Sequence, residues 1–310
     1  MKDIRILLTG AGGQIGQVLD GALREKYGHR AVLATDAKAI SSFPEFEILD
    51  VLDHDHFRNL VEKFRPTMIY HLAGILSAVG EKNPDLAWSV NTQGWINCLG
   101  LAVRNQVERV FFPSSIAVFG PGSPLKETRQ NVPLHPSTVY GITKMAGERL
   151  AAYFFLKHKL DVRGLRYPGI ISYQTVPGGG TTDYAVDIFH KLLAHGRFEC
   201  YLAPDRKLPM MYIDDAIRGT IQLMEADPEQ IRIRTAYNFG AMSFSPADLT
   251  EVIRSFIPDI SVEFKPDFRN EIAENWPEKI IDEEARRDWG WKPQYGLHEM
   301  VQEMIKNLRE

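Results

Sequence analysis

The first 170 residues alternate short apolar runs with segments of helical periodicity. A continuous apolar run occurs at residues 4–8, and further short strand-like segments occur at 31–36, 46–50, 67–74, 109–115 and 161–167. Between them, apolar side chains recur every three or four residues, as in Ile15, Val18, Leu19, Ala22 and Leu23. Runs of the first kind indicate buried strands, and the second spacing indicates amphipathic helices.

This alternation predicts an α/β fold. Strands that alternate with helices are joined by right-handed crossovers, which gives a Rossmann-like, doubly wound parallel sheet covered on both faces. Two predicted helices are long, at 84–104 and 140–157. We predict a Rossmann domain over 1–172 and a smaller, mainly substrate-binding part over 173–310, with the chain re-entering the Rossmann part around 209–240. Ligands of such sheets bind beyond the carboxyl ends of the strands.

The first predicted strand ends in a glycine-rich turn, TGAGGQIG, which contains Gly10, Gly13 and Gly16. Such a turn lets the backbone approach a pyrophosphate, and the following helix N-terminus favours negative charge. The spacing is GxxGxxG rather than the strict GxGxxG. Asp36 ends the second strand, where a carboxylate accepts hydrogen bonds from the adenosine ribose and repels a 2′-phosphate. We therefore predict NAD rather than NADP, although Lys38 nearby is a mild argument against it.

Tyr140 and Lys144 form a YxxxK pair one helical turn apart, and Ser114 and Ser115 end the fifth predicted strand. Tyrosine, with a pKa of about 10, is a poor base at neutral pH. A nearby ammonium and a positively charged nicotinamide would favour the phenolate and lower that pKa. Tyr140 would then take a proton from a substrate hydroxyl while hydride leaves the same carbon for the nicotinamide. Lys144 would also hold the ribose, and Ser115, with Ser114, would position the reacting oxygen.

With these residues in place, the chain resembles an extended short-chain dehydrogenase/reductase over nearly its whole length. Within that superfamily, HLAGILSAVGEKNP, LRYPGIIS, PGGGTTDYAVDIF and PDFRNEIAENWP resemble the short-chain-type L-threonine 3-dehydrogenases. The resemblance implies NAD-dependent oxidation of the C3 hydroxyl of L-threonine to 2-amino-3-ketobutyrate, a step of threonine catabolism. This chain has Ser114-Ser115 where that family often has Ser-Thr, so a hydroxyl is kept.

The motifs and the resemblance together define a predicted cofactor site. Asp50 and Val51 would flank the adenine, and the segment 71–74 would lie along the cofactor. Asn91 lies in VNTQG, which resembles the superfamily's segment after the fourth strand. The cofactor-binding residues are predicted to be Gly10, Gly13, Gln14, Ile15, Gly16, Asp36, Asp50, Val51, Leu72, Ala73, Gly74, Asn91, Tyr140, Lys144, Tyr167, Pro168 and Ile170.

A predicted substrate loop, PGGGTTDY at 177–184, contains three successive glycines followed by two threonines. The glycines would let the loop close over a small substrate, and a threonine hydroxyl would bind its carboxylate or amino group. Alternatively, the loop is a surface segment whose threonines cap the next helix, which is compatible with ligand contact. The substrate contacts are predicted to be Ser77, Ser114, Tyr140, Thr181 and Thr182. Trp276 could either border this pocket or pack in the core.

Composition excludes several other classes. A net charge of −4 without a basic run argues against nucleic acid, and no apolar stretch reaches 18 residues. The expected protein is cytoplasmic, with Cys98 and Cys200 reduced, and with no metal at His54 and His56 because no third ligand follows. The superfamily commonly pairs through its two long helices, so a homodimer is expected. The rival hypotheses are a nucleotide-sugar epimerase or dehydratase and a non-catalytic NAD-sensing protein.

Overall fold

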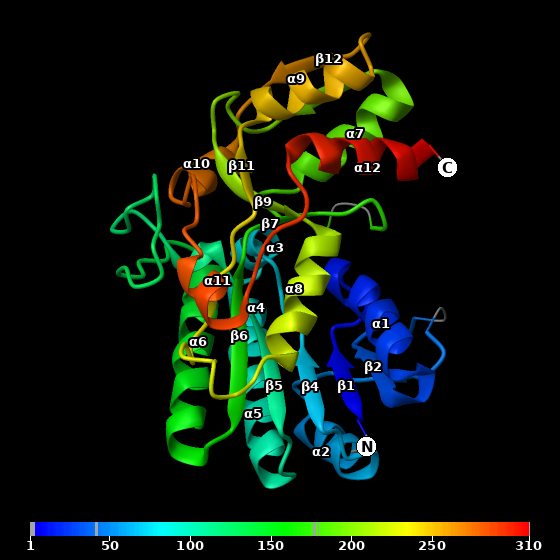
Figure 1. Ribbon diagram of the computed structural model, residues 1–310, viewed down its shortest axis with the longest axis vertical. Helices are drawn as coiled ribbons and strands as arrows, with labels where there is room; N and C mark the ends of the chain where they lie inside the picture. The colour runs from blue at the N-terminus through cyan, green and yellow to red at the C-terminus, as the bar shows by residue number, and fades with distance from the viewer. Residues whose placement is uncertain (1–3, 41–42, 176–177, 179, 310) are drawn as a thin grey trace.

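A seven-stranded parallel sheet forms the larger part of the computed structural model, which describes residues 4–40, 43–175, 178 and 180–309 (Figure 1). The strands lie in the order β10-β6-β5-β4-β1-β2-β3, and every neighbouring pair is parallel. Their bounds are β1 Ile6–Thr9, β2 Val32–Asp36, β3 Phe46–Ile48, β4 Met68–His71, β5 Arg109–Ser115, β6 Asp161–Tyr167 and β10 Tyr237–Asn238. All six strands expected from the apolar runs are present, so the predicted Rossmann-like α/β fold is confirmed.

The order of the strands reverses between β1 and β4. From β1 the chain moves outward to β2 and β3, whereas from β4 it moves the opposite way to β5 and β6. The loops at the carboxyl ends of β1 and β4 therefore diverge, and they leave a crevice at the point of reversal. This crevice is the place where an open parallel sheet binds its ligand.

Alternate side chains of the sheet pack against helices on opposite faces. Leu7 of β1 packs in one buried cluster with Phe57 and Trp95, whereas Ile6 packs in the other with Leu19. The first face is covered by α2 (His54–Phe64), α5 (Gly94–Arg104) and α6 (Val139–His158), and the second by α1 (Gln14–Tyr27) and α8 (Ile213–Glu225).

The long helix expected over 84–104 is divided into three helical parts. It consists of α4 (Pro84–Trp88), a π-helical segment η2 (Ser89–Gln93) and α5. Within η2 the Asn91 amide accepts a hydrogen bond from the Ile75 N–H and donates to the Ile75 carbonyl and the Thr143 hydroxyl. A wider turn at this point lets one buried amide satisfy partners on two other segments. The second long helix, α6, runs unbroken over 139–158.

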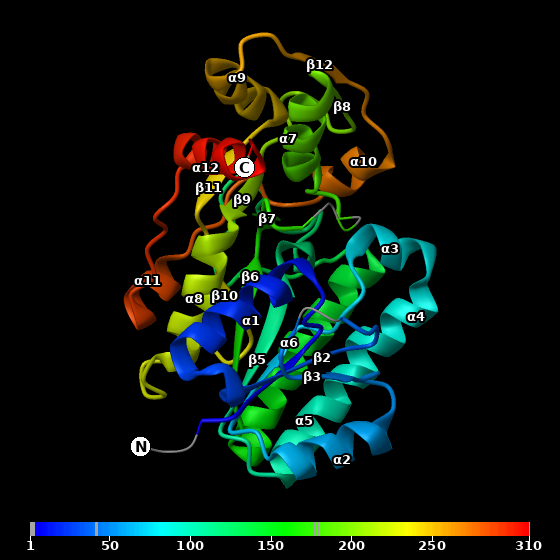
Figure 2. The same cartoon turned by 90° about the vertical axis from the view of Figure 1, so that its right-hand side faces the viewer.

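The C-terminal part lies above the carboxyl edge of the large sheet, as both views show (Figures 1 and 2). It contains a three-stranded sheet, β11-β9-β7, and a two-stranded parallel sheet, β12-β8. Its strands are β7 Gly169–Ile171, β8 Arg197–Cys200, β9 Leu208–Tyr212, β11 Met242–Phe244 and β12 Ser261–Phe264. Its helices are α7 Tyr184–His195, α9 Pro246–Phe256, α10 Phe268–Glu274 and α12 Leu297–Arg309, while α11 (Glu283–Trp289) packs near β10.

Between the two parts, α8 and β10 return the chain to the large sheet. The remaining short helices are η1 His29–Ala31, α3 Ser77–Lys82 and η3 Ile116–Val118. Across the described ranges, the model contains no helix with the length and apolarity that crossing a bilayer requires.

Candidate active site

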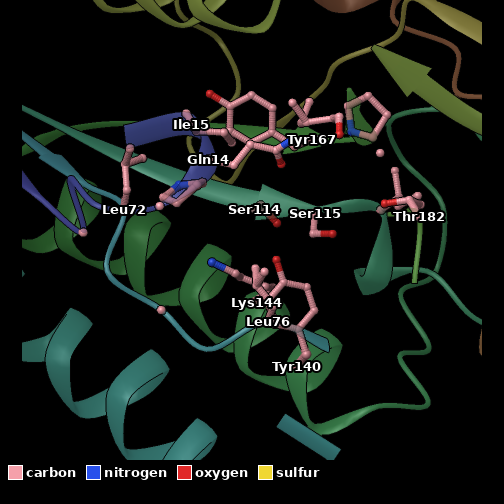
Figure 3. Close-up of a pocket in the computed structure, with 18 of the residues that line it drawn as sticks. Gln14, Ile15, Leu72, Leu76, Ser114, Ser115, Tyr140, Lys144, Tyr167 and Thr182 are labelled. Carbon is pink, nitrogen blue, oxygen red and sulfur yellow. Dashed lines mark hydrogen bonds between the residues drawn. The ribbon is translucent and has the colours of Figure 1, made fainter. Parts of the chain in front are cut away.

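A pocket opens at the point where the strand order reverses, between the large sheet and the C-terminal part (Figure 3). Its walls come from the turn after β1, the end of β4, the end of β5, α6, the β6–β7 junction and the start of α7. The lining residues are Gly10, Gly13, Gln14, Ile15, Gly16, Leu72, Gly74, Leu76, Pro113, Ser114, Ser115, Ile116, Tyr140, Lys144, Tyr167, Pro168, Gly169, Ile170, Thr182, Asp183 and Trp276. Most of the residues predicted from sequence to bind cofactor or react therefore face one space.

The glycine-rich turn has the geometry that a dinucleotide cradle needs. Gly10 has a φ of +72°, and a Cβ there would lie 2.5 Å from the Ala73 backbone nitrogen. A Cβ on Gly16 would lie 2.5 Å from the Gly10 carbonyl oxygen. Gly13 precedes the first turn of α1 and provides no capping side chain, so the N-terminus of α1 is open to an anion. The turn therefore fits the pyrophosphate of NAD.

Several predicted cofactor residues lie beside the pocket rather than in its lining. Asp36 accepts hydrogen bonds from the backbone N–H groups of Gly12 (3.0 Å) and Lys38 (3.2 Å), which holds its carboxylate at the edge of the glycine turn. Asp50 accepts from the Leu52 N–H at 2.9 Å. Val51 is buried at the end of the third strand.

Two further predicted residues support the loop after β4 from behind. Ala73 packs against Gly10, and Asn91 holds the backbone of Ile75.

Tyr167 does line the pocket, but its hydroxyl hydrogen-bonds the Thr220 hydroxyl on α8. Its ring, and not its hydroxyl, therefore faces a ligand.

The start of α6 brings the predicted catalytic residues together. Thr138 caps the helix by accepting from the Gly141 N–H at 3.1 Å. The Lys144 Nζ lies 5.4 Å from the centroid of the Tyr140 ring. Ser115 hydrogen-bonds the Tyr140 hydroxyl, which points toward the end of β5 (Figure 3). A tyrosine, a lysine and a serine thus converge on one side of the pocket.

The electrostatics of this group differ from the sequence-based expectation. Burial raises the pKa of Tyr140 to about 12, and the Ser115 hydrogen bond only opposes this rise. Burial also lowers the pKa of Lys144 to about 8. The sequence predicted that the ammonium would lower the phenol pKa. In the protein alone, desolvation is the larger effect because it penalises both charged forms.

The two adjacent serines have different partners. The Ser114 hydroxyl donates to the Glu148 carboxylate at 2.6 Å, and Glu148 forms a buried ion pair with Arg166. Ser115 instead faces Tyr140 and accepts from the Ala117 N–H at 3.2 Å. Successive strand residues point to opposite sides, so the Ser115 hydroxyl meets Tyr140, whereas the Ser114 hydroxyl is held by Glu148 although Ser114 also lines the pocket.

The predicted substrate loop contributes its second threonine to the pocket. Thr182 lines it, whereas Thr181 is buried behind, 3.5 Å from the hydroxyl of Ser77. Residues 176, 177 and 179, which include two members of the predicted loop, lie outside the described residues. The expectation that a glycine loop closes over substrate therefore stays a prediction.

Asp183 and Trp276 also line the pocket. Sequence reasoning left Trp276 open and did not single out Asp183. Asp183 accepts from the Gly180 N–H at 2.8 Å at the start of α7. The available signal was its position directly after the two threonines of the predicted substrate loop. Among the described residues that line the pocket, the charged side chains are Lys144 and Asp183.

This fold and site define a nicotinamide-dependent oxidoreductase, and sequence comparison agrees. The chain belongs to the NAD dependent epimerase/dehydratase family, whose profile matches residues 6–240. It is 43% identical to the mitochondrial L-threonine 3-dehydrogenase of Bos taurus, over 97% of this chain and 82% of that protein.

Solved structures show the same relationship. The chain is 47% identical to a GalE-like L-threonine dehydrogenase from Cupriavidus necator in its holo form, with a TM-score of 0.96 over 98% of this chain and 99% of that one. It is 46% identical to a monomeric L-threonine 3-dehydrogenase from a metagenome, also with a TM-score of 0.96, over 98% of each chain. The resemblance stated from the sequence motifs is therefore confirmed.

Proposed function

We propose that this protein is an NAD-dependent L-threonine 3-dehydrogenase that converts L-threonine to 2-amino-3-ketobutyrate. The observation that carries the proposal is the convergence of Tyr140, Lys144 and Ser115 on a pocket that Thr182 and Asp183 also line. The pocket has a glycine turn for a dinucleotide at one end. The names of the close relatives in the Bos taurus and Cupriavidus necator comparisons point to the same activity.

NAD would be held along the carboxyl edge of the sheet. The turn at Gly10, Gly13 and Gly16 would receive the pyrophosphate, and Asp36 would receive the adenosine ribose. Lys144 would reach the nicotinamide ribose. When bound, NAD supplies a hydride acceptor and a positively charged ring near the Tyr140 phenol.

The chain's own groups then handle the substrate proton. Tyr140, as phenolate, takes the proton of the C3 hydroxyl, and Ser115 hydrogen-bonds the same oxygen and orients it. Because burial raises the pKa of Tyr140, the phenolate needs a nearby positive charge to form. Lys144 supplies part of that charge while it is protonated.

The other end of an amino-acid substrate needs partners of opposite charge. We infer that the Asp183 carboxylate receives the α-ammonium group, since it is the acidic side chain in the described lining. Thr182 would hydrogen-bond the carboxylate, and Trp276 would cover the methyl group. This arrangement presents the C3 hydroxyl toward Tyr140.

The test is NADH formation followed at 340 nm with a panel of amino acids and UDP-sugars. We expect absorbance to rise with L-threonine and not with UDP-sugars, and to vanish in Tyr140→Phe. Conversion of UDP-sugars without NADH release would instead support the hypothesis that the protein is a nucleotide-sugar epimerase. A threonine-dependent rise that survives in Tyr140→Phe would remove this residue as the base.

We also propose that the protein is a cytoplasmic homodimer, paired through α4, α5 and α6. Large apolar side chains are exposed on these helices, and Leu156 on α6 is 70% accessible. The accessible fractions of Trp88 and Tyr153 are 50% and 54%. Both cysteines, Cys98 and Cys200, are free and buried, as a reducing compartment allows.

A further inference from the structure

A buried polar cluster lies directly behind the catalytic residues. Glu148 is fully buried on α6, two helical turns beyond Tyr140 and one beyond Lys144. Its carboxylate receives two bonds from Arg166, from Nε at 2.9 Å and from Nη2 at 2.8 Å, and one from the Ser114 hydroxyl at 2.6 Å. One side chain of α6 therefore joins the ends of β5 and β6.

Arg166 extends the cluster toward the C-terminal part. Its Nη1 donates to the Gln130 carbonyl at 3.0 Å and to the Asn238 side-chain oxygen at 3.1 Å. Asn238 in turn donates to the backbone carbonyls of Thr128 and Ile281. Each nitrogen of the Arg166 guanidinium thus has a hydrogen-bond partner. These hydrogen bonds offset the free-energy cost of burying the two charges of the Arg166–Glu148 ion pair.

The residues in this cluster are the immediate chain neighbours of the pocket. Ser114 precedes Ser115, and Arg166 precedes Tyr167, both of which line the site. In an extended strand, fixing one residue fixes the direction of the next. We propose that Glu148 is a positioning residue for the reaction proposed above. It fastens the ends of β5 and β6 to α6, and so fixes how Ser115 meets the Tyr140 phenol.

The charges of Glu148 and Arg166 also influence the ionisation of the Tyr140 phenol. Glu148 lies about 12 Å from Tyr140 along the helix axis. Replacing Glu148 with Gln keeps the shape but leaves the Arg166 guanidinium without its counter-charge, and this favours the nearby phenolate. Other charged or titratable groups around the phenol, which the variants leave unchanged, are Lys144, Asp183, the buried His71 near Lys144, and Glu81 of α3, which accepts from the Val139 N–H at the start of α6.

The experiment compares Glu148→Gln with Asp161→Asn, a second variant that breaks a buried ion pair. Asp161 binds the buried Arg163 at 2.6 Å at the other end of β6, about 20 Å of strand away from the pocket. Both variants should lower the melting temperature. Only Glu148→Gln should move the rising limb of kcat against pH, by about 0.5 to 1 pH unit toward acid.

A second readout does not depend on activity. In hydrogen–deuterium exchange, Glu148→Gln should speed exchange at residues 113–118 and 165–171, while Asp161→Asn should leave both segments protected. Should Glu148→Gln fail to fold, Ser114→Ala removes only the β5 link. It should speed exchange at 113–118 alone and lower kcat severalfold, without altering the pH profile or the KM for NAD.

An unmoved or alkaline-shifted pH profile in Glu148→Gln, or unchanged exchange at both strand ends, would overturn the positioning role. A wild-type protein that oxidises no threonine would instead overturn the proposed function. In that case the exchange data still decide whether Glu148 orders the strand ends. The two failures are therefore distinguishable.

Discussion

At the scale of single residues, the site depends on a phenol that is difficult to ionise. Desolvation opposes the Tyr140 phenolate, and the Lys144 ammonium beside it is itself destabilised by burial. The protein alone therefore does not stabilise the Tyr140 phenolate or the Lys144 ammonium. If Tyr140 is the base, as proposed, proton abstraction depends on a nearby positive charge, which the bound cofactor would supply.

The first prediction concerns pH. Because the pKa of Tyr140 is raised to about 12, the fraction of phenolate grows as pH rises, and kcat for threonine should increase from pH 7 into the alkaline range. The apparent pKa of kcat should lie below 12, since kcat reports the complex in which the nicotinamide charge is present. Steady-state rates at saturating NAD and threonine from about pH 6 to 10, which is about two units either side of the Lys144 pKa of about 8, provide the measurement. A rate that falls over this range would contradict the assignment of Tyr140 as base.

The second prediction concerns Asp183. Losing a charge-assisted hydrogen bond to the substrate ammonium should raise the KM for threonine in Asp183→Asn by about 10- to 100-fold. The KM for NAD should stay within about twofold, since the cofactor is held elsewhere. Asp187→Asn, one turn further along α7 and outside the pocket lining, is the matched control. Equal effects of the two substitutions would remove Asp183 from the substrate site.

At the scale of elements, the sequence predicted the strands well and the contacts between segments less well. Strand β1 was predicted because buried parallel strands are continuously apolar, a local property of the chain. The π-helical segment around Asn91 was not predicted, because its cause is two partners, Ile75 and Thr143, that are remote in sequence.

In the candidate site, too, the features set by local sequence were predicted, and those set by contacts between remote segments were not. The glycine turn, Tyr140 and Lys144 follow from motif spacing, and the structure places them around one pocket. The sequence predicted that Ser115, with Ser114, positions the oxygen, and both serines line the pocket. It could not show that the Ser114 hydroxyl is held by Glu148, because that depends on the strand's rotation against α6. Asp183 was missed because only the packing of α7 above the sheet brings it to the site.

The third prediction tests the close packing that places α6. A Cβ on Gly141 would lie 2.1 Å from the Ala117 carbonyl oxygen, so Gly141→Ala must push α6 away from η3. Such overpacking should cost about 1–3 kcal/mol and lower kcat, because Tyr140 is the preceding residue. Gly100 on α5 has open space around its Cβ position, so Gly100→Ala should be neutral or stabilise by about 1 kcal/mol. Thermal melts and kcat for both variants provide the measurement, and equal stability would contradict the close contact.

At the scale of the whole molecule, several of the exposed apolar side chains lie on the layer formed by α4, α5 and α6. Helices α4, α5 and α6 pack against one another on the same face of the sheet. On α6, Ile142, Tyr153 and Leu156 recur at spacings of 11 and 3 residues, which places them on one side of the helix. A contiguous apolar surface of this kind is uncommon on a monomer and is usually covered by a partner.

The last prediction is that charge on this layer prevents dimer formation. We expect wild-type protein to sediment as a dimer, and Trp88→Glu combined with Leu156→Glu to sediment as a monomer, since two buried carboxylates without partners oppose the interface. Ile48→Lys is the control, because Ile48 is 53% accessible but lies on the edge strand β3, away from α6. The similar metagenome L-threonine 3-dehydrogenase is described as monomeric. A wild-type protein that stays monomeric at all concentrations would therefore show that this chain is monomeric as well, despite its exposed apolar layer. If the monomeric double variant still oxidises threonine at the wild-type rate, each site is complete within one chain, as the pocket lining indicates.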